Sequence, residues 1–163
     1  MTALGACEEV DLALDFNTIQ MREILVPVDG SQASMDALAL ACFLAKHNKG
    51  TVYAVYVIEV ARAMALDADL PPEAAEGEEM LRKAEALATE MDYEVSGELL
   101  QARDAGHAIV DEAIERAVDA VILGIDYTTA PGELGSQSNA MYVMTHAPCR
   151  VIVWRSAIEE GAR

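Results

Sequence analysis

The chain has 163 residues and a mass of 17.5 kDa, enough for one domain with a sizeable hydrophobic core. Hydrophobic residues make up 53% of it, which favours a folded domain over disorder, and the net charge of −17 opposes binding to nucleic acid or an anionic membrane. No apolar run approaches the roughly 20 residues that cross a bilayer, and residues 1–15 lack the basic flank and apolar core of a secretory signal.

The acidic surplus is most simply a solubilising surface, although a high-salt cytoplasm would also fit it. The three cysteines, Cys7, Cys42 and Cys149, are odd in number and widely separated, and two of them lie in apolar patterns. Such thiols are typical of a reducing compartment, where disulfides are rare. Together these features predict a cytoplasmic protein with no nucleic-acid partner and no membrane insertion.

The first 20 residues are acidic and weakly patterned. Leu12, Leu14 and Phe16 alternate along the chain, which fits a short added edge strand. A loose extension fits the same segment at least as well.

From residue 21 onward, short apolar runs alternate with segments of helical periodicity. Residues 59–77 give no readable pattern, and Pro71-Pro72 is interpreted as a break. The alternation predicts one α/β domain, in which right-handed crossovers build a parallel sheet covered by helices on both faces. Strands are expected at 23–28, 51–58, 94–100, 120–124 and 150–154, and helices between Ser31 and Lys49 and at 78–91, 108–117 and 136–145.

Candidate binding residues follow the first and fourth strands. In open α/β sheets, ligands bind beyond the carboxyl ends of the strands, where the strand order reverses, so these two loops would share a crevice if their strands are neighbours. Asp29 would accept hydrogen bonds from a ligand there, or simply cap the next helix. Gly124 would allow a ligand to approach closely, or simply let the backbone turn. Gly135 and Ser136 open a helix whose N-terminus either faces a phosphate or is merely capped by the serine.

The sequence contains no convincing catalytic or metal-binding constellation. No pair among the three histidines has metal-ligand spacing, and there is no Cys-x-x-Cys, nucleophile elbow or complete P-loop. Met141 and Met144 share one helix face and are expected in the core. We therefore expect a protein that is not an enzyme.

Five stretches of the chain together resemble the universal stress protein family: ILVPVDGS, VYAVYVIE, VDAVILG, LGSQS and HAPCRVIVW. The resemblance covers nearly the whole chain from Met21 to Trp154. It implies a five-stranded parallel sheet in the order 3-2-1-4-5 with a Rossmann-like fold of the adenine nucleotide alpha-hydrolase type. It also implies a homodimer, in which the last strand, Arg150–Trp154, pairs across the interface. The family domain is accordingly placed at 21–156, between an N-terminal extension (1–20) and a C-terminal tail (157–163).

Nucleotide-binding members of this family bind ATP through a motif of the form G-x2-G-x9-G-[S/T]. By resemblance, Gly124 matches the first glycine and Gly135-Ser136 match the last pair, while Ser138 matches a hydroxyl residue that contacts phosphate.

The adenosine side of the family's site also has counterparts in this chain. Asp29 and Val57 match positions that contact adenine and ribose. Pro27 and Val28 match positions that line the same wall of the binding site. The residues that the resemblance assigns to nucleotide binding are Pro27, Val28, Asp29, Val57, Gly124, Gly135, Ser136, Gln137 and Ser138.

The motif is nevertheless degenerate. Tyr127 stands where the second glycine belongs, and the spacer from there to Gly135 is shorter than in the motif. Asp126 and Glu133 are acidic, and no lysine or arginine occurs between Gly124 and Arg150. The adenosine half of the site therefore matches the family, whereas the polyphosphate half departs from it.

The leading functional hypothesis is a universal stress protein that binds ATP, ADP or AMP without catalysis, with or without Mg²⁺, and acts through its dimer or a partner surface. The alternative is a dimeric interaction or regulatory module that has lost nucleotide binding. ATP hydrolysis, with Asp126 or Glu133 positioning a water molecule, is the weakest of the three. No residue identifies the protein partner.

Overall fold

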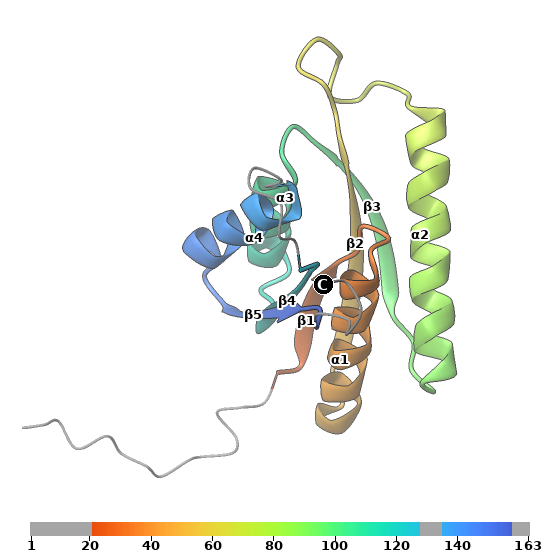
Figure 1. The fold of residues 1–163 in the computed structure, drawn as a ribbon, viewed down its shortest axis with the longest axis vertical. Coiled ribbons are helices and arrows are strands. Elements are labelled where there is room, and N and C mark those ends of the chain that lie inside the picture. The colour runs from red at the N-terminus through yellow and green to blue at the C-terminus, as the bar shows by residue number, and fades with distance from the viewer. Residues whose placement is uncertain (1–20, 128–134, 158–163) are drawn as a thin grey trace, which may run out of the picture.

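The computed structural model of the protein describes residues 21–127 and 135–157. They form a parallel sheet of five strands in the order β3-β2-β1-β4-β5 (Figure 1), which confirms the predicted fold class and strand order. In chain order, the elements of the described residues are β1 (Glu23–Pro27), α1 (Gln32–Asn48), β2 (Thr51–Glu59), α2 (Pro71–Glu90), β3 (Ser96–Ala102), α3 (Ala105–Glu115), β4 (Ala120–Ile125), α4 (Gly135–His146) and β5 (Arg150–Arg155).

Helices cover both faces of the sheet. Figure 1 shows α1 and α2 on one side and α3 and α4 on the other. Because successive strand residues point to opposite faces, β1 contributes to two separate cores. Ile24 packs in one core with Leu38 of α1, and Leu25 packs in the other with Ile109 of α3 and Val143 of α4. The apolar run of β1 is therefore buried on both sides, as its composition predicts.

The turn from β1 into α1 is closed by local hydrogen bonds. The Ser31 side chain is the N-cap and accepts a hydrogen bond from the Ser34 N–H at 3.2 Å. At its other end, α1 stops at Lys49, which adopts a left-handed conformation with φ of 53°. Both helix boundaries lie where the sequence places them.

Helix α2 differs from its prediction because it begins at Pro71 rather than at Glu78. The Pro71-Pro72 pair occupies the first helical positions. The N–H groups there have no partner within the helix, so a proline loses no hydrogen bond, and its fixed φ suits a helix. Farther along, a Cβ at Gly77 would lie 2.3 Å from Leu99 Cδ1, so glycine lets the helix lie close to the sheet. The interpretation of the prolines as a break is wrong, since they start the helix.

Helix α4 buries a narrower face than its sequence suggests. Ala140 and Val143 are buried against the sheet. Met141 and Met144 instead have exposed fractions of 60% and 46%, so the prediction that they lie in the core is wrong. Ala140 and Val143 are the buried positions among the described side chains of α4, with Tyr142 partly buried beside them.

The described cysteines are free thiols. Cys42 in α1 is fully buried, and burial raises the pKa of its thiol to about 11. A thiol with such a pKa is protonated and unreactive at neutral pH. Cys7, like the alternation of Leu12, Leu14 and Phe16, lies outside the described residues.

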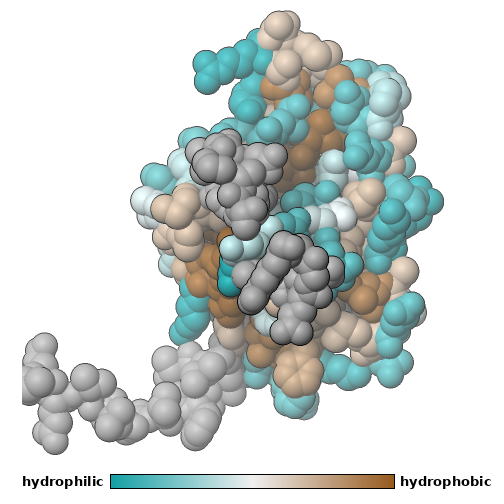
Figure 2. All heavy atoms as spheres, viewed as in Figure 1, coloured by the Kyte–Doolittle hydropathy of each residue, from teal (hydrophilic) through white to brown (hydrophobic). Residues whose placement is uncertain are grey.

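The described surface is mixed in character. On the face shown in Figure 2, hydrophilic residues are interspersed with smaller hydrophobic patches. Within the described ranges, no helix has both the length and the apolar character that a membrane crossing requires.

Candidate functional site

A crevice opens between β1 and β4, where the strand order reverses. β1 pairs with β2 along all five of its residues, but its ladder with β4 is confined to Ile24 and Leu25. Beyond Leu25 the two strands separate toward their carboxyl ends. The loops after the first and fourth strands therefore share one crevice, at the position where open α/β sheets bind ligands.

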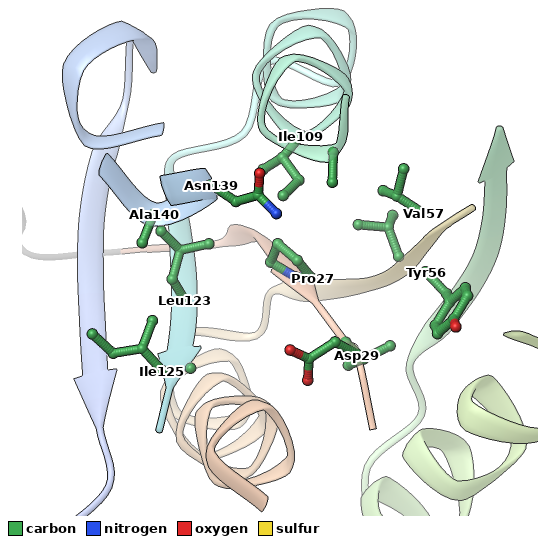
Figure 3. Close-up of a pocket in the computed structure, with 13 residues that line it drawn as sticks. Pro27, Asp29, Tyr56, Val57, Ile109, Leu123, Ile125, Asn139 and Ala140 are labelled. Carbon is green, nitrogen blue, oxygen red and sulfur yellow. The ribbon is translucent and has the colours of Figure 1, made fainter. Parts of the chain in front are cut away.

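A cavity of about 130 Å³ fills this crevice on the side of the sheet covered by α3 and α4. Its walls are mainly apolar, and Figure 3 shows the carboxylate of Asp29 and the carboxamide of Asn139 among the side chains that border it. The lining residues are Pro27, Val28, Asp29, Val55, Tyr56, Val57, Ala105, Ile109, Leu123, Gly124, Ile125, Asn139 and Ala140.

Asp29 closes the turn before α1 but does not cap the helix, whose N-cap is Ser31, and one of its carboxylate oxygens remains available. Its Oδ1 accepts a hydrogen bond from the Ser31 N–H at 2.9 Å, which closes the turn before α1. Its Oδ2 has no hydrogen bond to any residue in the described part of the chain. Asp29 is exposed, and in Figure 3 its carboxylate points into the space between β1 and β4. The side chain can therefore hold the turn and accept a further hydrogen bond.

Gly124 lines the cavity, but its lack of a side chain serves helix packing. A Cβ at this position would lie 2.1 Å from the carbonyl oxygen of Ala33 and 2.5 Å from the backbone nitrogen of Ser34. The first turn of α1 thus occupies the space that any side chain would need. Gly124 is not among the residues with positive φ, so the backbone conformation does not itself require glycine.

The α4 side of the site is only partly described. The α4 backbone begins at Gly135, but the side chains of Gly135, Ser136 and Gln137 lie outside the described part of the chain. Ser138 is exposed and is not among the cavity-lining residues, whereas Asn139 is. Of the nine residues assigned by resemblance, the cavity brings together Pro27, Val28, Asp29, Val57 and Gly124.

Several lining residues were missed by the sequence prediction. Ala105 and Ile109 come from α3, which the family motif does not mention, and only the packing of α3 over the sheet brings them to the cavity. Asn139 had a usable signal, because it lies one helical turn after Gly135 and Ser136.

Tyr127, which replaces the second glycine of the motif, is tied to the end of β5. Its backbone N–H donates a hydrogen bond to Ser156 Oγ at 2.9 Å. The guanidinium carbon of Arg155 lies 4.9 Å from the centroid of the tyrosine ring, a cation–π contact. The shortened spacer between Tyr127 and Gly135 lies outside the described residues.

The charge of the site is unfavourable to an anion. Asp29 is the one charged residue among those that line the cavity in the described structure. Asp126, beyond the end of β4, is exposed and adds a second carboxylate nearby. Among the described residues, no group of three or more histidine, cysteine and acidic side chains could hold a metal ion.

Comparison with known proteins places the chain in a family. The family model of the universal stress proteins matches residues 21–155. A universal stress protein of Methanocaldococcus jannaschii is 30% identical over 145 residues, which span 85% of this chain and 85% of that protein. The solved structure of the universal stress protein UspA from Lactobacillus plantarum is 29% identical, with a TM-score of 0.66 over 83% of this chain and 99% of its own.

A second similar structure contains a ligand. The universal stress protein from Archaeoglobus fulgidus in complex with dAMP has a TM-score of 0.64 over 82% of this chain and 96% of its own. At 21% identity this likeness shows the fold alone. The family model and the relative from Methanocaldococcus jannaschii each match most of the chain, and the protein therefore belongs to the universal stress protein family.

Proposed function

We propose that this protein binds an adenine nucleotide in the crevice between β1 and β4 without catalysis, and acts as a nucleotide-responsive stress protein. The observation that carries the proposal is the placement of Asp29, whose free Oδ2 faces a mainly apolar cavity at the strand-order reversal. The binding of dAMP by the similar protein from Archaeoglobus fulgidus supports the same class of ligand.

The chemistry of the walls suits the adenosine part of such a ligand. Pro27, Val57 and Ile109 offer apolar surfaces against which a base can pack. Asp29 Oδ2 can accept a hydrogen bond from a ribose hydroxyl or an exocyclic amine. Asn139 can both donate and accept through its carboxamide. One carboxylate and one carboxamide in an apolar setting would fix the orientation of a nucleoside.

The phosphates of the nucleotide would lie outside the cavity that holds the nucleoside. The cavity measures about 130 Å³, whereas pockets that enclose drug-sized ligands have roughly 300–1,000 Å³. The phosphates would therefore lie outside it, toward the N-terminus of α4, where backbone N–H groups and the helix dipole favour anions. Gly135, Ser136, Gln137 and Ser138 are proposed to contact them there, with Mg²⁺ offsetting part of the charge.

Isothermal titration with adenosine, AMP, ADP and ATP, with and without Mg²⁺, tests this function. We expect binding of all four, with a smaller advantage of ATP over AMP than in a family member that has the complete motif. Asp29→Asn should weaken the binding of adenosine, because its amide oxygen can keep the Ser31 hydrogen bond but an NH2 donor then replaces the Oδ2 acceptor that faces the ligand. Asp36→Asn on α1 removes the same charge outside the cavity and should leave binding unchanged. No heat and no change in Tm at millimolar ligand would refute the proposal.

A second candidate is a homodimeric interaction module that has lost nucleotide binding. Tyr127 in place of glycine, the nearby carboxylates and the small cavity favour it. In both candidates we propose a cytoplasmic homodimer that pairs through β5, an edge strand of the described sheet with Trp154 exposed by 41%. Native mass spectrometry of the purified protein separates the candidates, because co-purified adenine nucleotide would exclude the second.

A further inference from the structure

The proposed nucleotide site needs a cation that its own walls do not supply. The lining residues include the carboxylate of Asp29 and no lysine, arginine or histidine. In the sequence, no lysine or arginine occurs between Gly124 and Arg150, so the loop after β4 cannot provide one either. A phosphate chain leaving the cavity would therefore meet uncompensated negative charge, unless another element contributes a basic side chain.

The register of β5 places an arginine beside the cavity wall. Ile125, which lines the cavity, is paired with Arg155 on the neighbouring strand. Paired residues of adjacent strands share a face, and Ile125 and Val153 both pack in the core under α3 and α4. Arg155, two residues after Val153, therefore leaves the sheet on the face that carries the cavity. Adjacent strands lie about 4.8 Å apart, well within the length of an arginine side chain.

The Arg155 side chain contacts an aromatic ring but forms no ion pair within the described residues. Its guanidinium lies on the ring of Tyr127, and within the described residues no carboxylate lies within salt-bridge distance of it. Arg103, another arginine at this end of the sheet, donates hydrogen bonds to the carbonyl oxygens of Val60 and Met64. Both side chains are exposed, but the guanidinium of Arg103 is hydrogen bonded to the backbone, whereas that of Arg155 lies on the ring of Tyr127.

We propose that Arg155, positioned by Tyr127, is the cation that contacts the phosphate chain of a nucleotide bound in the crevice. This inference rests on the proposed function and adds a residue to it. Tyr127, which removes a glycine from the phosphate loop, provides the surface on which the compensating arginine lies. An arginine can contact two phosphate oxygens at once, which suits di- and triphosphates better than a monophosphate.

The test compares two arginines on the same strand. Arg155→Gln and Arg150→Gln each remove one positive charge from β5, but Arg150 lies at the opposite end of the sheet. Dissociation constants for AMP, ADP, ATP and inorganic tripolyphosphate would be measured by titration calorimetry without Mg²⁺ at low and high salt. We expect Arg155→Gln to weaken ATP and tripolyphosphate about tenfold and AMP by less than about twofold. Arg150→Gln should leave the ratio of ATP to AMP affinity unchanged.

Two variants of Tyr127 test whether its ring positions Arg155. Tyr127→Phe keeps the ring and should bind like the wild type, whereas Tyr127→Leu should lose part of the preference for ATP. Equal effects of Arg155→Gln and Arg150→Gln, in a protein that still binds AMP, would overturn the role of Arg155 and leave the proposed function standing. A wild-type protein that binds neither AMP nor tripolyphosphate would overturn both.

Discussion

Gly124 in β4 and Ala33 in α1 approach each other so closely that a Cβ on the glycine would lie 2.1 Å from the alanine carbonyl oxygen. The contact joins the strand at the cavity to the helix that begins directly after Asp29. A residue that the family motif assigns to nucleotide binding is thus needed here for folding. Loss of ligand binding in a Gly124 variant would not by itself show a ligand contact.

Gly124→Ala should destabilise the fold by about 3 kcal/mol or more, because backbone atoms must move to admit the methyl group. Urea denaturation followed by circular dichroism gives the free energy of unfolding. Gly97→Ala in β3 is the matched control, since its Cβ would meet the end of the Glu85 side chain, 3.1 Å away, which can rotate. Equal stability losses in the two variants would contradict the packing role of Gly124.

Asp119 should make stability depend on pH in the acid range. Its Oδ2 accepts hydrogen bonds from the backbone N–H groups of Glu23 and Arg22, both at 2.9 Å. The bond from Glu23 first, and that from Arg22 next, hold the pKa of the Asp119 carboxyl below its ordinary value of 3.8. A carboxyl with a depressed folded-state pKa stabilises the fold above its unfolded-state pKa, and the contribution is lost as the pH falls through the folded-state pKa.

Asp119→Asn should therefore lower the free energy of unfolding at neutral pH by roughly 1–2 kcal/mol. It should also flatten the decline in stability between about pH 5 and pH 3. Unfolding curves across this range test both effects, with exposed Asp111→Asn on α3 as a control for the loss of one negative charge. The same slope in the Asp119 variant and the wild type would contradict the prediction.

Val153→Pro should dissociate the proposed dimer without unfolding the monomer. The N–H groups of Arg150 and Ser156 donate to carbonyl oxygens along β4, at Asp119 and Ile125. By the alternation of a strand, the Val153 N–H points away from β4 toward the free edge, where a proline is tolerated. Sedimentation velocity should show a monomer with the circular dichroism spectrum of the wild type.

Ile152→Pro is the contrasting variant, since its N–H points toward β4 and its loss should destabilise the fold. A Val153→Pro protein that remains a dimer would exclude pairing through β5.

Arg116 should matter more for stability than an exposed arginine. Its guanidinium contacts the carboxylates of Glu98 and Glu112, and its central carbon lies 4.5 Å from the centroid of the Tyr53 ring. Glu112 has an exposed fraction of only 9%, so Arg116→Met would leave a largely buried carboxylate without its cation. We expect a loss of about 1–3 kcal/mol in urea denaturation.

Arg82→Met, which breaks an exposed pair with Glu79, should change stability by less than about 0.5 kcal/mol. Adding Glu112→Gln to Arg116→Met should restore part of the loss, and no recovery would argue against an unpaired carboxylate as the cause.

Local sequence patterns predicted most of the fold, because each strand and helix carries its own periodicity. β1 is an unbroken apolar run with a turn and an N-cap serine after it, and the structure follows that pattern. The pattern failed at Pro71, since a proline pair can end one segment or begin another, and the local sequence does not decide between them. It also failed at Met141, whose exposure depends on how little of α4 reaches the sheet.

The candidate site was less predictable than the fold because it is assembled from distant segments. Asp29 and Val57 were found through family resemblance, and both line the cavity. Ile109 could not be found in this way, because the side chains of α3 reach the cavity only through packing. The position of Arg155 depends on the register between β4 and β5, which a single sequence does not encode in any local pattern.

The two-residue ladder between β1 and β4 is a weak connection between two parts of the sheet. One half contains β3, β2 and β1, the other β4 and β5, and the seam is hydrogen bonded only near its amino end. A ligand in the crevice would add contacts across the part of this seam where the two strands are not paired with each other. Ligand binding would therefore reduce the motion of one half of the sheet relative to the other. Slower hydrogen exchange in β4 and β5 would report this binding even if no helix or strand changed its conformation.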